Sequence, residues 1–153
     1  MRLIIVFFLL IISCSSDVIE KTKFIPINNI EELSTDERTL LFKVDSFRQV
    51  NGKKPFILDK LHSELALKRN IDNSKLDSIS HEGFPDAYVI FINLGLTAVG
   101  ENLGHKYSSA KTVFEAWVKS NGHIINLLSD AKYTGASRLD TVGTVYYCQI
   151  FSK

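Results

Sequence analysis

Cysteine is scarce in this chain, because only Cys14 and Cys148 occur among its 153 residues. Two cysteines allow one intramolecular disulfide at most, and none if Cys14 is modified or removed. Cys148 lies inside a predicted strand, so we interpret it as a small buried hydrophobe and not as a nucleophile. Stability is therefore expected to come from a hydrophobic core.

Neither sign of charge gathers into a block, and the formal net charge is only +1. A phosphate backbone demands a concentrated basic face, so nucleic acid is excluded as a partner. The sequence also lacks a nucleophile elbow, a phosphate-binding loop, a His-Glu-x-x-His zinc motif and a dinucleotide fingerprint. No catalytic residue is assigned, and the length fits one domain.

Long hydrophobic runs are absent except at the N-terminus, where residues 3–12 form an apolar stretch after Met1 and Arg2. This stretch is shorter than the roughly 20 residues that a membrane-spanning helix needs. A basic start, an apolar middle and the small residues 13–16 are typical of an export signal. We therefore predict a signal peptide at 1–13; a short buried helix at the start of the domain is the alternative.

Cys14 follows Ile11, Ile12 and Ser13, a pattern that resembles a loose bacterial lipoprotein box. The hypothesis is that Cys14 becomes a lipidated N-terminus that anchors the protein to a membrane of the cell envelope. Simple secretion after cleavage behind Ser15 is the alternative. Residues 14–33 are polar and broken by Pro26, so they are predicted to form a tether.

Periodicity from residue 34 onward predicts one α+β domain at 34–153. Ser34 and Glu37 have the spacing of a capping box at the start of the first helix. The last strand is apolar on both faces, so helices are expected on both sides of a small, mainly antiparallel sheet. The expected segments are a helix after Ser34, a helix over 58–70, a helix over 86–94, a strand over 97–103, a helix from 108 or 109 to 120, and a hairpin of 133–138 with 144–151.

Two histidines, His81 and His123, lie at element boundaries beside small residues, and Glu101 follows an apolar strand. Two imidazoles and a carboxylate can bind a divalent cation such as zinc. They can equally form a hydrogen-bonded cluster that ties loops together. Ser120 lies three residues before His123, which places both on one face if a helical turn continues. His62 is expected at a solvated or rim position, and His105 in a loop.

Five motifs occur in order along the chain, and together they resemble the CAP (SCP) superfamily of cysteine-rich secretory, venom-allergen and pathogenesis-related proteins. They are Ser80-His81-x-Gly83, Gly100-Glu101-Asn102-Leu103, Trp117-x-x-Ser120-x-x-His123-x-x-Asn126, Gly135, and Tyr147-x-Gln149-x-Phe151. The resemblance is to the short bacterial branch and implies a three-layer α-β-α sandwich. It also implies a cleft lined by two histidines and two acidic residues.

His81, Glu101 and His123 match three of those four cleft positions, and Ser120 stands where the fourth acidic residue is expected. Asn102 belongs to the same set of cleft candidates. The resemblance implies an exported binding or interaction module, whose cleft takes a small lipid, another envelope ligand or a loosely bound cation. A metal-assisted, peptidase-like hydrolase that uses the same cleft is the alternative.

Overall fold

The computed structural model describes residues 32–153. The expected signal peptide, Cys14 and most of the tether lie outside the described residues. No helix within residues 32–153 is long and apolar enough to cross a membrane. This part of the chain forms five helices and four strands: α1 (Thr35–Val50), β1 (Ile57–Leu58), α2 (Lys60–Lys75), α3 (Phe84–Asn93), β2 (Ala98–His105), α4 (Ala110–Lys119), α5 (Asn121–Leu127), β3 (Tyr133–Thr141) and β4 (Thr144–Ser152).

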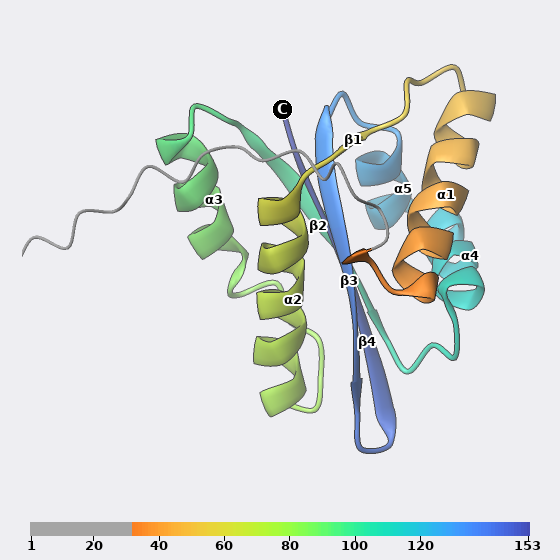
Figure 1. The fold of residues 1–153 in the computed structure, drawn as a ribbon, viewed down its shortest axis with the longest axis vertical. Helices are drawn as coiled ribbons and strands as arrows, with labels where there is room; N and C mark the ends of the chain where they lie inside the picture. Colours follow the sequence, from red (N-terminus) through yellow and green to blue (C-terminus); the bar gives the residue numbers. More distant parts are fainter. Residues whose placement is uncertain (1–31) are drawn as a thin grey trace, which may run out of the picture.

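The strands form a single sheet in the order β1-β3-β4-β2. The β3–β4 and β4–β2 pairs are antiparallel, and the short β1 pairs parallel with β3. Helices α2 and α3 lie on one side of this sheet, and α1, α4 and α5 lie on the other (Figure 1). The α+β class with a mainly antiparallel sheet is thus confirmed, while β1 and α5 were not foreseen as separate elements.

Local signals set the helix ends. Ser34 caps α1 and exchanges hydrogen bonds with Glu37, so the predicted capping box is present. Ser109 caps α4. Asp59 caps α2, which continues to Lys75 and not to residue 70 as expected. Each cap satisfies a backbone N–H that the first helical turn leaves without a partner.

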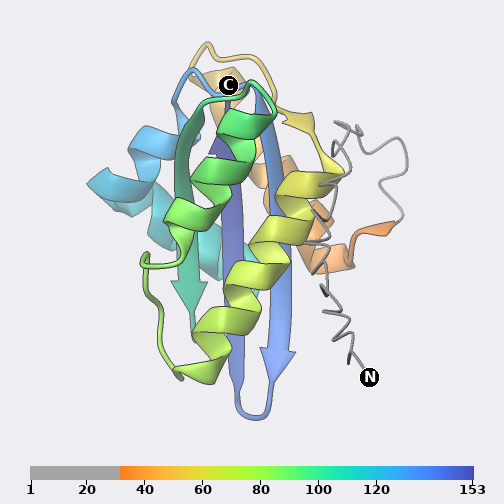
Figure 2. The same cartoon turned by 90° about the vertical axis from the view of Figure 1, so that its left-hand side faces the viewer.

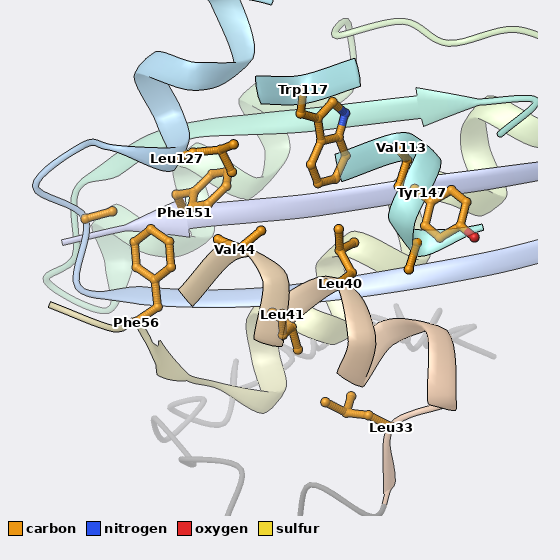
Figure 3. Packing of buried hydrophobic residues seen from close by; sticks show 13 residues of the cluster. Leu33, Leu40, Leu41, Val44, Phe56, Val113, Trp117, Leu127, Tyr147 and Phe151 are labelled. Atoms are coloured by element: carbon orange, nitrogen blue, oxygen red, sulfur yellow. The ribbon is translucent and has the colours of Figure 1, made fainter. Parts of the chain in front are cut away.

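Two hydrophobic clusters lie on opposite faces of the sheet. Tyr147 and Phe151 of β4 belong to the cluster beneath α1 and α4. Cys148 and Ile150 belong to the cluster beneath α2 and α3. Figure 3 shows Trp117 of α4 packed in the first cluster. The prediction that both faces of the last strand are covered is therefore confirmed.

Helix α2 lies along the sheet and contacts both β3 and β4 (Figure 2). Gly135 of β3 allows this close approach, because a Cβ at that position would lie 2.5 Å from the His62 carbonyl carbon and closer still to the Ser63 nitrogen. The glycine at the fourth motif is thus explained by packing between a helix and a strand.

Candidate functional site

Glu101 lies on the edge strand β2, and its side chain is only 1% exposed. Arg69 of α2 donates to both carboxylate oxygens, from Nε to Oε2 at 3.0 Å and from Nη2 to Oε1 at 3.1 Å. His81 Nδ1 donates to Oε1 at 2.8 Å. A buried, two-pronged ion pair therefore holds an imidazole whose side chain is 66% exposed.

The loop between α2 and α3 is built around Arg69. Its Nη2 also donates to the carbonyl oxygen of Ser80. Gly83 leaves room for the guanidinium, because a Cβ there would collide with Arg69. Burial lowers the pKa of Arg69, but the hydrogen bonds and charge of Glu101 outweigh this effect and raise the pKa above its ordinary value. The glycine of the first motif thus serves the ion pair that positions His81.

The next residue of β2, Asn102, is bonded to the opposite layer of helices. Asn126 of α5 donates from Nδ2 to Asn102 Oδ1 at 2.9 Å and to the Glu101 carbonyl at 3.2 Å. Asn102 in turn donates to the carbonyl oxygen of His123 at 3.2 Å. Gly100 leaves space for the Asn126 amide, which a Cβ would approach within 2.6 Å. These motif residues therefore tie α5 to the edge of the sheet.

His123 is half-buried, and its ring centroid lies 6.1 Å from that of Trp117. Its Nδ1 is buried and has no hydrogen-bond partner within residues 32–153. Burial lowers the pKa of His123, and the positive charge that His81 can carry lowers it further. The two histidines thus come from opposite sides of the sheet and interact electrostatically beside β2.

We expect the ring signals of His123 in an NMR titration to have a midpoint below the ordinary value of about 6.5. His81→Gln removes one cause of the lowered pKa, so the midpoint should rise but stay below the ordinary value, because burial persists. Glu82→Gln, at an exposed neighbouring position, is the matched control. Since the folded state disfavours the proton on His123, its effect on stability is unfavourable only as the pH falls below about 6.5. An unchanged midpoint in His81→Gln would contradict the coupling.

Ser120, the last of the candidate site residues, lies at the junction of α4 and α5. Its carbonyl oxygen accepts from the His123 N–H at 3.1 Å, and its side chain makes no capping bond. Within the described ranges, no group of three or more His, Cys, Asp or Glu side chains is arranged to hold a metal ion. Both oxygens of Glu101 are already engaged by Arg69 and His81.

Sequence reasoning missed a second polar series on the α2 side of the sheet. His62 Nδ1 lies 2.5 Å from Asp59 Oδ1, and its Nε2 lies 2.7 Å from Ser152 Oγ. All three residues are fully buried, and Phe91 of α3 stacks on the imidazole. The solvated or rim position expected for His62 is therefore wrong. Without solvent access, this Asp-His-Ser series ties α2 to the end of β4.

His105 and Cys148 lie on the two paired strands β2 and β4. His105 ends β2 and stacks on the ring of Tyr146 at 4.6 Å, so its expected place in a loop is wrong. Cys148 is fully buried, which confirms its interpretation as a small hydrophobe. Burial raises the pKa of this thiol well above its ordinary value and keeps it protonated.

Seven chains among the solved structures match this chain, and they include one from Borrelia burgdorferi and one from Staphylococcus aureus. An outer surface protein of Borrelia burgdorferi superposes with a TM-score of 0.64 at 18% identity, over 86% of this chain and 97% of the other. A cysteine-rich secretory protein of Staphylococcus aureus superposes with a TM-score of 0.63 at 18% identity, over 81% of this chain and 40% of the other.

Sequence comparison adds nothing to this likeness, because no family model and no curated protein matches the chain. At 18% identity, the likeness concerns the fold. The ordered motifs of the sequence and the arrangement of its helices and strands nevertheless lead to the same conclusion. This chain has the CAP-like fold of a bacterial cysteine-rich secretory protein.

Proposed function

We propose that this chain is an exported, lipid-anchored binding module that takes a small ligand or an envelope partner at His81 and His123. The observation that carries the proposal is the exposed His81 imidazole, which a buried ion pair holds in one orientation. A buried pair is weak evidence for stability alone, so a positioning role is the better account of it. His123 adds a second imidazole, whose pKa is lowered by burial and by the charge of His81.

The similar proteins agree with export, since one is described as an outer surface protein and the other as secretory. The basic start, apolar stretch and Cys14 of this chain point to the same destination. In this proposal the lipid on Cys14 attaches the chain to a membrane of the cell envelope. A hydrolase that uses zinc is less well supported, because Glu101 could bind a cation only by giving up its bonds to Arg69 and His81.

We expect His81→Ala/His123→Ala to abolish capture of a discrete component from a detergent extract of the producing cells' envelope. Glu82→Ala/Asn121→Ala changes two exposed neighbouring positions and should retain that capture. The measurement is the amount of the component retained by the immobilised full chain and by each variant. Equal retention by all three proteins would show that the histidines do not form the binding site.

Zinc titration by calorimetry tests the alternative hydrolase. We expect no zinc binding tighter than millimolar, because the Glu101 carboxylate already accepts hydrogen bonds from Arg69 and His81. Arg69→Met should increase zinc affinity if the ion pair is what withholds that carboxylate. Tight binding by the unmodified chain would favour the hydrolase and contradict the binding module.

Metabolic labelling with an alkynyl fatty acid tests the anchor. Cells that produce the full chain should incorporate the label, and cells that produce Cys14→Ala should not. Cys148→Ala is the matched control, because it removes the other cysteine and keeps the proposed lipidation site. Equal labelling of the Cys14→Ala variant and the parent chain would rule the anchor out.

A further inference from the structure

Arg48, near the C-terminal end of α1, is a buried cation without a carboxylate partner. The residue is only 3% exposed. Its Nε donates to the Lys54 carbonyl at 2.8 Å, and its Nη1 donates to the Leu127 carbonyl at 2.6 Å and the Ser129 carbonyl at 3.2 Å. No Asp or Glu among residues 32–153 lies within ion-pairing distance of it.

This guanidinium lines a pocket of about 610 Å³ between the segment that leads from α1 to β1 and the turn that precedes β3. Lys53, Lys54 and Lys132 line the same pocket, and the one carboxylate there is that of Asp130. Asp130 lies 3.3 Å from Lys53 Nζ, and its side chain is 81% exposed. The lining therefore carries four cationic side chains against one anionic side chain.

The positive charge on Arg48 is held in an unfavourable place. Burial lowers its pKa, and the more distant charges of Asp45 and Asp130 offset part of that effect. The guanidinium also covers the ring of Phe56, with 3.6 Å between its central carbon and the ring centroid. A buried cation whose hydrogen bonds all go to neutral carbonyls is stabilised when an anion reaches it, because the interaction is strong where water is excluded.

The rest of the pocket lining is apolar, which favours a ligand that also has an apolar portion. Pro55, Ile57 and Ala131 border the pocket, and the lysines add their aliphatic stems. The Nη2 of Arg48 makes no hydrogen bond within residues 32–153 and can donate to an oxygen of a phosphate or a carboxylate, and the lysines add point charges around it. Such a lining suits a molecule with an anionic oxygen group at one end and an apolar portion at the other.

We propose that this pocket binds an amphiphilic oxyanion, with its phosphate or carboxylate group near Arg48 and the lysines and its apolar part along Ile57 and Ala131. The pocket shares no residue with the His81 and His123 site, so it is independent of the proposed function. A soluble acidic metabolite and the headgroup of an anionic lipid both have this chemistry. Free octyl phosphate and charged vesicles distinguish these two sources.

Calorimetric titration of the full chain with octyl phosphate, below its micelle concentration, tests the proposal. We expect saturable binding that Lys53→Ala/Lys54→Ala/Lys132→Ala weakens at least tenfold. Lys68→Ala/Lys111→Ala/Lys119→Ala removes the same number of charges from exposed positions outside the pocket and should change the affinity less than twofold. Octyl glucoside, which is neutral, should not bind. His81→Ala/His123→Ala should bind octyl phosphate like the parent chain.

Vesicles of phosphatidylglycerol, with phosphatidylcholine as the neutral comparison, form the second arm. Binding of free octyl phosphate identifies a soluble ligand, and binding of the charged vesicles alone identifies a lipid headgroup. In either case the triple variant of the pocket must lose the binding. The proposal is overturned if neither probe binds, or if both triple variants weaken binding equally. The proposal is also overturned if inorganic phosphate binds as tightly as octyl phosphate and binds the two triple variants equally. That result would mark an adventitious ion only.

Discussion

Arg69→Met is expected to lower the free energy of unfolding by about 3–5 kcal/mol, because it leaves a buried carboxylate without its main cation. The side chains of Arg69 and Glu101 are 5% and 1% exposed, and two hydrogen bonds join them. After the substitution, Glu101 keeps only His81 as a charged partner. The cost therefore arises mainly from desolvation of an unpaired charge.

Urea denaturation of the variant and the parent chain measures this loss. Lys68→Met, in the adjacent position of α2, is the matched control, because Lys68 is exposed and pairs with Asp72 on the surface. Surface pairs contribute about 0–1 kcal/mol, so the control should stay near the parent. Arg69→Met/Glu101→Leu removes both charges and should recover part of the stability. A loss below about 1 kcal/mol for Arg69→Met would contradict the role of the pair.

Gly135→Ala is expected to cost about 3 kcal/mol, near the upper end for overpacking a well-packed interior. The added methyl group would lie within 2.5 Å of the backbone of His62, so the whole of α2 must move away from β3. That movement also lengthens the bond between His62 and Ser152, which is 2.7 Å in the parent chain. Backbone cannot rotate out of the way as a flexible side chain can.

Gly122→Ala is the matched control for this prediction. A Cβ at residue 122 meets nothing within 4 Å, and the residue lies inside α5. Alanine is a better helix former than glycine, so this variant should be neutral or more stable by up to about 1 kcal/mol. Thermal unfolding followed by circular dichroism compares the two. Equal melting temperatures for Gly135→Ala and the parent would refute the packing argument.

Much of the fold follows from local pattern. The capping box of Ser34 and Glu37 marks the start of α1, and alternation along 144–151 predicts a strand with two buried faces. Both signals depend on near neighbours in the chain, so they can be read without tertiary structure. The short β1 could not be predicted in this way, because two residues, Ile57 and Leu58, form a strand only when β3 lies beside them.

The buried face of α2 was predicted wrongly, because hydropathy does not identify polar side chains that are buried and hydrogen-bonded in the interior. Leu58, Leu61 and Leu65 set the predicted apolar face, yet Leu58 belongs to β1 and Leu61 is only partly buried. The face that meets the sheet includes His62, Leu65, Ala66, Arg69, Asn70 and Asn73. Their spacing of three and four residues was present in the sequence, and Arg69 and His62 on that stripe were the signal that could have been followed.

The sequence by itself determined the order of most elements, the two covered faces of the last strand and the set of motif residues that includes His81, Glu101 and His123. Only the tertiary structure decided that Glu101 faces Arg69 and His81, that Asn102 faces α5, and that His62 is buried. The physical reason is that adjacent residues of a strand point to opposite sides. Which helix supplies the partner on each side depends on contacts between residues far apart in the chain.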